Sequence, residues 1–424
     1  MKWFDISKFP TYKHTLYHFV IMLFCMMLTI LSLDIPFFWD NVYLVSKMAH
    51  YYYENSFPSV VLPLELDSGH PPFYAMYVAA MWSCFGKTLA VSHWAVFPFL
   101  VGLGIAYYHL ARYLLPSKAV PFAMILLLIE PTLLAQSVLG GVDIALVCLY
   151  LVALNGTFYR KHGMLAIALC LMSAFSLRGI IAVGLLGLTE FVIRFQESRI
   201  TGERFFYRIY SVIYKIIPAY LPSIGFVLIW LIYHYQINSF LASNPDSPWA
   251  ADYGFVDFKA WIKNLVIIDW RLLDFGRITL WAATVFLFFK WWKTVDGGGW
   301  TTDKTESNAK ISPSQIKIQN SKIKPQKSNT ESRISNIQSP ITNTKSRITS
   351  HQLLISYILL PLLFYLPFIT LRYAPILHRY FLPAFLLVSI LFIAVWWTIE
   401  NKKVKSLVFG MVVFSLLSGH FWMY

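Results

Sequence analysis

The chain alternates long apolar runs with short polar stretches, which is the pattern of a protein whose helices cross a membrane many times. Several runs approach or exceed the roughly 18 to 20 residues that a helix needs to cross a bilayer core. They lack the strand-length alternation of a membrane barrel, so they indicate α-helices. The runs are 17–33, 71–86, 89–114, 117–136, 141–158, 163–177, 179–195, 216–235, 277–293, 352–371, 381–398 and 406–422.

Lysine and arginine decide which runs cross, because cytoplasmic loops carry an excess of both. The three lysines among the first 13 residues predict an inner N-terminus. If the run 71–86 crossed, three later basic turns (112–118, 160–161 and 194–215) would all face outward. We therefore predict about eleven spanning helices with the C-terminus outside. The run 71–86 is then an interfacial helix in a long first outer loop, 34–88.

The predicted bundle has a polar interruption. Residues 297–350 are rich in Ser, Thr, Asn, Lys and Ile and hold few large apolar residues, so we expect a disordered cytoplasmic tract. It separates a membrane module, 1–296, from a three-helix C-terminal part, 351–424.

Composition supports a membrane protein and excludes other classes. Hydrophobic residues make up 57% of the chain and charged residues 13%, against about 25% charged in ordinary globular proteins. The net charge of +14 is spread over short loops and the polar tract, so no nucleic-acid groove is indicated. The four cysteines stand singly, and we predict neither a metal site nor a cofactor.

Two acids are the candidate catalytic residues. Asp40 follows the first run, and Asp143 opens a later run behind two glycines. Each could be a helix cap. Each could instead act at the outer membrane surface, Asp40 as a general base for an acceptor hydroxyl. The predicted topology puts both at outer helix ends, where they could converge on one site.

The first outer loop also supplies candidate binding residues. It holds a large share of the acids, including Asp67, and we expect these acids to be exposed. The stretch "DSGHPPF" predicts a rigid turn, because proline fixes φ and restricts the residue before it. His70 is then held at a helix start, where it could meet an anion such as phosphate or simply satisfy the turn.

Cations on the predicted outer side are the remaining candidates, because they run against the positive-inside preference. A guanidinium can grip a phosphate with two parallel hydrogen bonds, while lipid-headgroup anchoring is the alternative role. The candidate residues of this group are Arg178, Arg372, His378 and Arg379, together with Tyr380, which follows Arg379.

Glu130, which precedes Pro131, could have a purely structural role.

The sequence has no nucleotide-binding loop, zinc-protease motif or serine-hydrolase elbow in a suitable context. Carboxylates and cations at an outer membrane boundary instead suit transfer from a lipid-linked phosphate. A transporter or lipid flippase is the alternative, although we find no internal repeat of the kind many transporters show.

Several stretches together resemble polyprenyl-phosphate-dependent glycosyltransferases of the C superfamily (GT-C), and within it glycosyltransferase family 39. They are Asp40 after the first run, "DSGHPPFYAMYVAAMWSCFG", "VSHW", "LLIEPTLLAQSVLGGVDIAL" and "HRYFLPAF". Many members of the family have Asp-Glu where this chain has Asp40 and Asn41.

The resemblance implies a fold, a reaction and a location. The fold is a GT-C-like bundle with interfacial helices in the first outer loop. Asp40 is then the catalytic base, Asp143 a second acid, His70 a contact of the donor phosphate, and Arg379 with Tyr380 a late Arg-Tyr element. The expected function is inverting transfer of a sugar from a polyprenyl-phosphate donor to a glycan, lipid or protein acceptor. The expected location is the extracytoplasmic face of a bacterial inner membrane.

Overall fold

The structure, a computed structural model, describes residues 11–199, 205–241, 254–296, 350–372 and 377–421, together with residues 244 and 250. This part of the chain is all-α, as predicted, with one isolated bridge between Phe255 and Arg372. The predicted polar tract lies outside the described residues except for Ser350.

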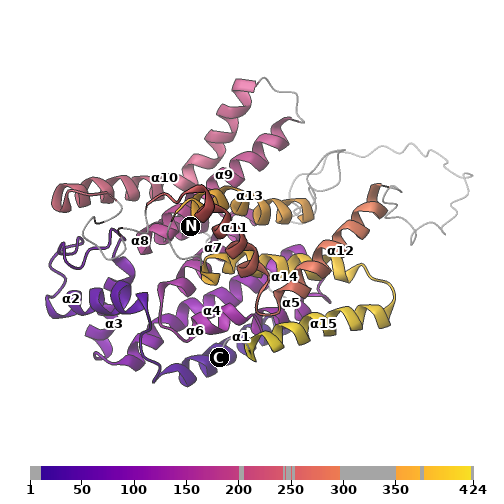
Figure 1. Cartoon of the computed structure of the whole chain (residues 1–424), viewed down its shortest axis with the longest axis horizontal. Helices are drawn as coiled ribbons and strands as arrows, with labels where there is room; N and C mark the ends of the chain where they lie inside the picture. Colours follow the sequence, from indigo (N-terminus) through magenta and orange to yellow (C-terminus); the bar gives the residue numbers. More distant parts are fainter. Residues whose placement is uncertain are drawn as a thin grey trace, which may run out of the picture.

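The elements follow one another without a named strand in the described residues (Figure 1). The first half comprises α1 (Thr11–Ser32), the π-helical turn η2 (Val42–Lys47), α2 (Met48–Glu54), α3 (Phe73–Phe85), α4 (Leu89–Leu114), α5 (Val120–Leu128), α6 (Pro131–Ser137), α7 (Val142–Phe158) and α8 (His162–Phe175). The second half comprises α9 (Leu177–Arg199), α10 (Phe205–Asn238), α11 (Phe258–Leu273), α12 (Arg277–Asp296), α13 (Ser350–Thr370), the 3₁₀ turn η4 (His378–Phe381), α14 (Leu382–Trp397) and α15 (Lys402–Phe421).

Several helices are long and apolar enough to cross a membrane. Four described segments meet that requirement alone: 14–32 in α1, α4, α10, and 378–397, which joins η4 to α14. Two bent pairs raise the number to six if each pair is one span. In one pair α5 meets α6 at 56°, and in the other α11 meets α12 at 86°. The chain is thus an integral membrane protein by the length and composition of its helices.

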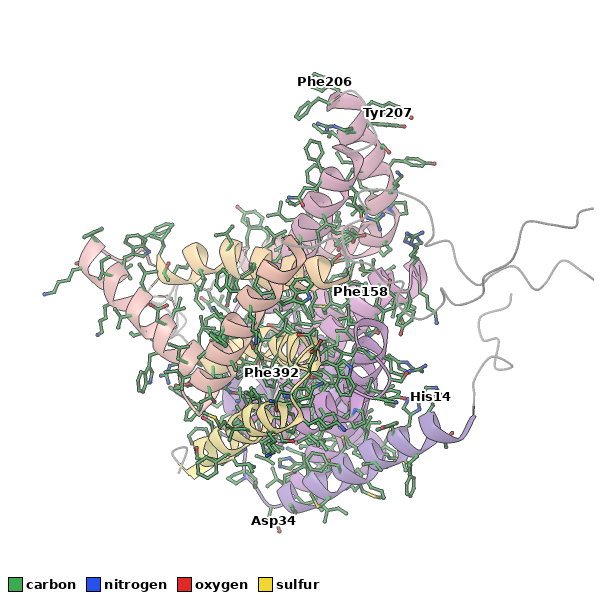
Figure 2. The ribbon with its side chains drawn as sticks, turned by 90° about the vertical axis from the view of Figure 1, so that its right-hand side faces the viewer. His14, Asp34, Phe158, Phe206, Tyr207 and Phe392 are labelled. Atoms are coloured by element: carbon green, nitrogen blue, oxygen red, sulfur yellow. The ribbon has the colours of Figure 1, made fainter. Side chains whose placement is uncertain are left out.

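Helix α14 lies at the centre of the bundle. It packs against α12, α13 and α5 and reaches α4 and α7. Nearly all of its side chains are buried, and Phe392 at its middle is fully enclosed (Figure 2). Because the helix is apolar on every side, it is stable only inside such a shell of other helices. The C-terminal helices therefore complete the same core as the first half of the chain.

The outer faces of other helices are as apolar as this core. Phe206 and Tyr207 are exposed at the tip of the projecting α9–α10 pair (Figure 2). Leu31 is exposed near the end of α1. Side chains of this kind have no favourable place in water but are at home in lipid. Exposed apolar faces on these helices agree with a bilayer around the bundle.

Helix α3 coincides with the run predicted to lie at the interface. Its 13 residues span about 20 Å, well short of the roughly 30 Å of a hydrocarbon core. It packs against α2 and α4 and buries Tyr74, Val78 and Trp82. Trp82 Nε1 donates to the Ser92 hydroxyl at 2.9 Å, which fixes α3 on the first turn of α4.

Candidate functional site

Four charged side chains from distant parts of the chain form one ion cluster, which we define as Asp40, Asp143, Arg178 and Arg379. Arg379 binds both oxygens of Asp40, with Nη1 at 3.0 Å from Oδ1. The same Nη1 lies 3.4 Å from Asp143 Oδ2. Arg178 Nη1 completes the cluster at 2.5 Å from Asp143 Oδ1. Two carboxylates and two guanidiniums therefore alternate, and their formal charges cancel.

Tyr380 holds the two cations of the cluster side by side. Its ring lies 5.3 Å from the guanidinium carbon of Arg178 and 5.6 Å from that of Arg379. Both contacts are within the range of cation–π attraction. The sequence analysis predicted all five of these residues as site residues, and the structure brings them together.

Local backbone features explain how Asp143 reaches the cluster. Gly140 has φ +67°, in the left-handed region where a side chain adds strain. A Cβ on Gly141 would lie 2.6 Å from Asn41 Oδ1, so only glycine allows this close approach. The two glycines thereby set the start of α7 directly against the segment that carries Asp40.

Neither acid acts as the helix cap that was its alternative role. The residue that caps η2 is Asn41, which makes no side-chain cap bond, and α7 is capped by Gly141. Asp143 lies in the first turn of α7, where a carboxylate is favoured by the helix dipole. Its hydrogen bond and its ion pairs go to arginines from other elements, so it serves the cluster rather than its own helix end.

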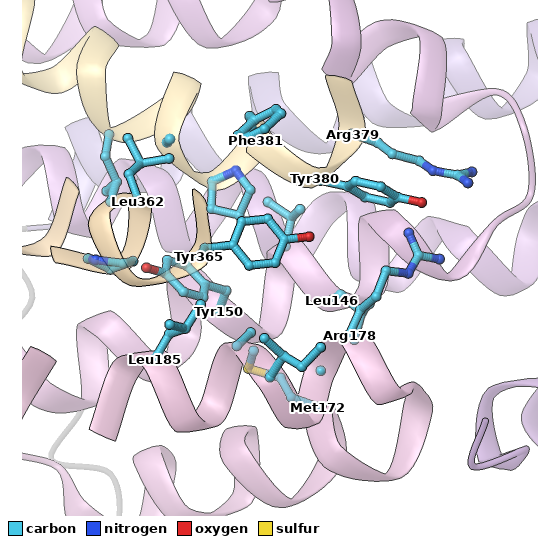
Figure 3. Close-up of a pocket in the computed structure, with 18 of the residues that line it drawn as sticks. Leu146, Tyr150, Met172, Arg178, Leu185, Leu362, Tyr365, Arg379, Tyr380 and Phe381 are labelled. Carbon is cyan, nitrogen blue, oxygen red and sulfur yellow. The ribbon is translucent and has the colours of Figure 1, made fainter. Parts of the chain in front are cut away.

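Two cavities meet at Arg379, which lines both. The first, which we call the apolar cavity, encloses about 890 Å³ of empty space including its mouth. Arg178 and Arg379 lie at one end of it, whereas Leu185 and Leu362 lie toward the other (Figure 3). Asp143 and Tyr380 also line it, so one end is charged and the rest is hydrophobic.

The second cavity, which we call the aromatic cavity, holds about 630 Å³ of empty space on the Asp40 side of Arg379. Asp40 and His378 line it together with the aromatic residues Phe38, Trp39 and Phe275. The ion cluster therefore has Asp143 in one cavity, Asp40 in the other and Arg379 between them.

His70 lies beside the cluster but is held by the start of α9. Its Nδ1 is 3.1 Å from the Ser176 hydroxyl and accepts from the Leu177 N–H at 3.4 Å. Burial, and then the nearby Arg178 guanidinium, lower the pKa of His70 to about 4. The ring is therefore neutral near pH 7 and carries its proton on Nε2. It fixes the backbone next to Arg178.

Asp67 is buried, so the expectation that the acids of this loop are exposed is wrong for it. Its Oδ1 accepts from the Gly69 N–H at 2.8 Å, and its Oδ2 contacts His234 Nε2 at 2.6 Å and Asn238. His234 and Asn238 belong to α10. An isolated buried carboxylate is costly, and these donors offset that cost. Asp67 thus fastens the first loop to α10 and lines neither of the two cavities.

The sequence analysis named two members of a second group of charges, Glu130 and His378, but missed Asp274 and Arg277 and did not predict that the four come together. Arg277 is fully buried, and its Nε donates to Glu130 Oε1 at 3.0 Å. It also contacts Asp274, and its guanidinium carbon lies 3.9 Å from the Phe385 ring centre. Asp274 Oδ2 in turn lies 2.5 Å from Nε2 of His378. We call Glu130, Asp274, Arg277 and His378 the hinge cluster.

The hinge cluster joins the two bent helix pairs. Glu130 caps α6 at the α5–α6 bend, and Asp274 and Arg277 flank the α11–α12 bend. His378 precedes Arg379 in η4, so its bond to Asp274 also fixes η4. Two sequence features could have indicated these bends, because each puts a helix-breaking residue beside a charged one. They are "EP" at 130–131 and "DFGR" at 274–277.

Arg372 is not part of the ion cluster. Its guanidinium carbon lies 5.2 Å from the Phe255 ring centre, and its carbonyl accepts from Asn264 Nδ2 at 3.1 Å. These contacts place it against α11 and the segment that leads into it. Among the described residues, no three His, Cys, Asp or Glu side chains are placed to hold a metal ion.

Comparison with known protein families, curated proteins and solved structures finds no match to this chain.

Proposed function

We propose that this protein is an inverting glycosyltransferase that moves a sugar from a polyprenyl-phosphate donor to an acceptor at the extracytoplasmic membrane face. The observation that carries the proposal is the position of Arg379, which is bonded to two carboxylates where an apolar cavity meets a second, more polar one. A transferase for two different substrates needs such a meeting point.

The apolar cavity suits a lipid phosphate because it matches both ends of such a molecule. Its hydrophobic wall fits an isoprenoid chain, and its charged end offers Arg178 and Arg379 to the phosphate. Arg379 Nε is buried without a hydrogen-bond partner among the described residues, so it has a donor to spare. An arginine with a free donor can bind a phosphate oxygen through a charge-assisted hydrogen bond.

The proposed reaction uses the ion pair as its starting state. A donor phosphate draws Arg379 away from Asp40, and the freed carboxylate faces the aromatic cavity. Asp40 then accepts the proton of the acceptor hydroxyl while that oxygen bonds to the anomeric carbon. The bond between the anomeric carbon and the phosphate oxygen breaks, and polyprenyl phosphate leaves with both electrons of that bond. Arg379 and Arg178 stabilise its charge.

The finer topology belongs to the same proposal. Eleven spanning helices with α3 along the outer surface put the ion cluster at the outer boundary, where a lipid headgroup lies. The 13-residue length of α3 and its packing against α2 support an interfacial position.

No observation favours the transporter alternative over this proposal. A polar path toward the inner side would involve Glu190, the ionisable residue farther along α9. Glu190 is bound by Arg194 at 2.7 Å and by the Tyr220 hydroxyl at 3.1 Å, and it lines neither described cavity.

The test begins with the lipid that accompanies the purified protein. Mass spectrometry of co-purified lipids should find a polyprenyl phosphate or its sugar-linked form. The protein in nanodiscs should then bind undecaprenyl phosphate and transfer sugar from one of a panel of polyprenyl-phosphate sugars. A protein that binds neither form and transfers none of the sugars would contradict the proposal.

A further inference from the structure

The aromatic cavity carries a combination of side chains that the proposed reaction does not use. Phe38, Trp39 and Phe275 line it together with the polar residues Thr132 and Gln136. Aromatic side chains on the wall of a cavity give an entering molecule an apolar surface to pack against. Partly positive C–H groups are attracted to the negative face of an aromatic ring.

Trp39 is held in an unusual backbone conformation beside Asp40, the proposed catalytic base. Its φ is +52°, in the left-handed region that bulky residues rarely adopt. Its side chain is 61% exposed, and Phe38 beside it is 62% exposed. The two rings contact each other edge to face at 6.4 Å. Two large aromatic rings are therefore presented openly, next to Asp40, instead of packing into the core.

Gln136 adds an unsatisfied polar atom to the same wall. Its Oε1 is buried and has no hydrogen-bond partner in the described part of the chain. Buried polar atoms are nearly always bonded, so an exception in a cavity calls for a partner from outside the protein. Since an amide oxygen accepts hydrogen bonds, the missing partner is a donor such as a hydroxyl.

Together these features describe a site for a pyranose ring. One face of such a ring is a patch of C–H groups, which packs on an indole or phenyl face, and its edge carries hydroxyls, which bond to amides. We infer that the acceptor is a carbohydrate, with its ring against Trp39 and Phe38, a hydroxyl bonded to Gln136 and the attacking hydroxyl directed at Asp40. This inference rests on the proposed function and selects the glycan among its three acceptor classes.

The test is saturation-transfer difference NMR on the full chain in nanodiscs, without any donor. The probes are a panel of methyl hexosides and hexosaminides, with a Ser/Thr peptide as the competing acceptor class. The wild-type protein should saturate ring C–H protons of at least one glycoside, and the peptide should give no such signal. Trp39→Ala should reduce the glycoside signal at least 5-fold, and Gln136→Leu should reduce it less.

Phe85→Ala is the matched control, because Phe85 is 68% exposed on the same loop and lines neither cavity. This variant should keep the glycoside signal. The inference is overturned if no glycoside is saturated, if the peptide binds instead, or if Phe85→Ala loses as much signal as Trp39→Ala. Binding is measured without a donor, so failure here is distinct from failure to bind undecaprenyl phosphate or to transfer sugar.

Discussion

Arg379 and Asp40 lie 339 residues apart in the chain and form a two-pronged ion pair, with Nη1 3.0 Å from Oδ1. The arginine is 8% exposed and the aspartate 18%. This pair joins the segment just before η2 to η4, which leads directly into α14. A donor phosphate that binds the guanidinium of Arg379 must therefore compete for it with Asp40, the proposed base.

Arg379→Lys should weaken the binding of undecaprenyl phosphate roughly 10- to 100-fold, since a charged hydrogen bond contributes about 1.5–3 kcal/mol. Lysine keeps the charge but not the planar fork that binds two oxygens. Arg372→Lys is the matched control and should leave binding near wild type, because Arg372 contacts Phe255 outside both cavities. The measurement is a binding titration in nanodiscs. Equal losses in the two variants would contradict the site.

Asp40→Asn should lower transfer by roughly 100- to 10,000-fold, because an amide cannot take up the acceptor's proton. It should preserve the fold with a modest loss of stability, since the amide keeps the size of the side chain and one acceptor oxygen toward Arg379, and Arg379 keeps its ion pair with Asp143. The measurement is single-turnover transfer from a saturating donor, alongside thermal unfolding. Near wild-type transfer would assign the base to another residue, with Asp143 the next candidate.

Asp67→Asn should show the opposite pattern. Asp67 accepts from Gly69 and contacts His234 and Asn238 while almost fully buried, and the amide nitrogen of asparagine would face either the Gly69 N–H or the Asn238 amide donor. Leaving such groups unsatisfied costs about 1–3 kcal/mol of unfolding free energy. The folded fraction of this variant should lose less transfer activity than Asp40→Asn. An unchanged unfolding transition would show that this buried contact does not stabilise the loop.

Arg277→Met should destabilise the protein by about 3–5 kcal/mol, because it leaves Glu130 as an uncompensated buried charge, whereas Asp274 keeps its contact with His378. Unfolding in mixed micelles titrated with a denaturing detergent measures the change. Adding Glu130→Gln to Arg277→Met should recover part of the loss by removing the carboxylate that Arg277→Met leaves unpaired. A double variant less stable than the single one would argue against charge burial as the cause.

The protein should lose stability as the pH falls from about 6.5 toward 4 through His70. Its folded pKa of about 4 lies below its ordinary 6.5, so the unfolded chain binds the proton first on acidification. The contribution of neutral His70 to the free energy of unfolding is fully present above pH 6.5. Below that pH it falls by about 1.4 kcal/mol per pH unit until the folded pKa is reached. Unfolding free energies of wild type and His70→Asn, measured across this range, should differ in slope. Equal slopes in the two proteins would show that His70 does not cause this loss of stability.

Cysteines on both sides of α3 should react with a membrane-impermeant reagent added from outside. Glu65→Cys and Lys87→Cys suit this test because both residues are exposed, and Cys84, also exposed, is first replaced by serine. The ion pair of Lys87 with Glu54 is at the surface, so its loss is tolerable. Labelling of only one position would mean that α3 crosses the membrane.

The sequence could predict the ion cluster because its members stand at the ends of apolar runs. Charge asymmetry predicts that Asp40, Asp143 and Arg379 lie on one side of the membrane, and side chains on one side of a bundle can converge. The all-α class followed from the same runs. Which acid pairs with which arginine could not be predicted, because it depends on how the helix ends are packed.

The hinge cluster could not be predicted from the sequence. Arg277 stands at the start of an apolar run, where an arginine is ordinarily read as a residue at the membrane surface. Its burial results from the 86° bend between α11 and α12, which turns that helix start into the bundle. Its partner Glu130 is 147 residues away, so no local pattern links the two.

The two carboxylates and two guanidiniums of the ion cluster have no net charge, which affects the anions that the site can bind. An anion dissolved in the surrounding water is not attracted by a net positive charge, and to bind it must displace the carboxylates from Arg379. An anion that brings an apolar chain gains additional free energy from the cavity behind the arginines, and that gain can offset the broken ion pair. In the proposed function, this cancellation of charge within the ion cluster favours phosphate attached to a lipid over phosphate free in solution.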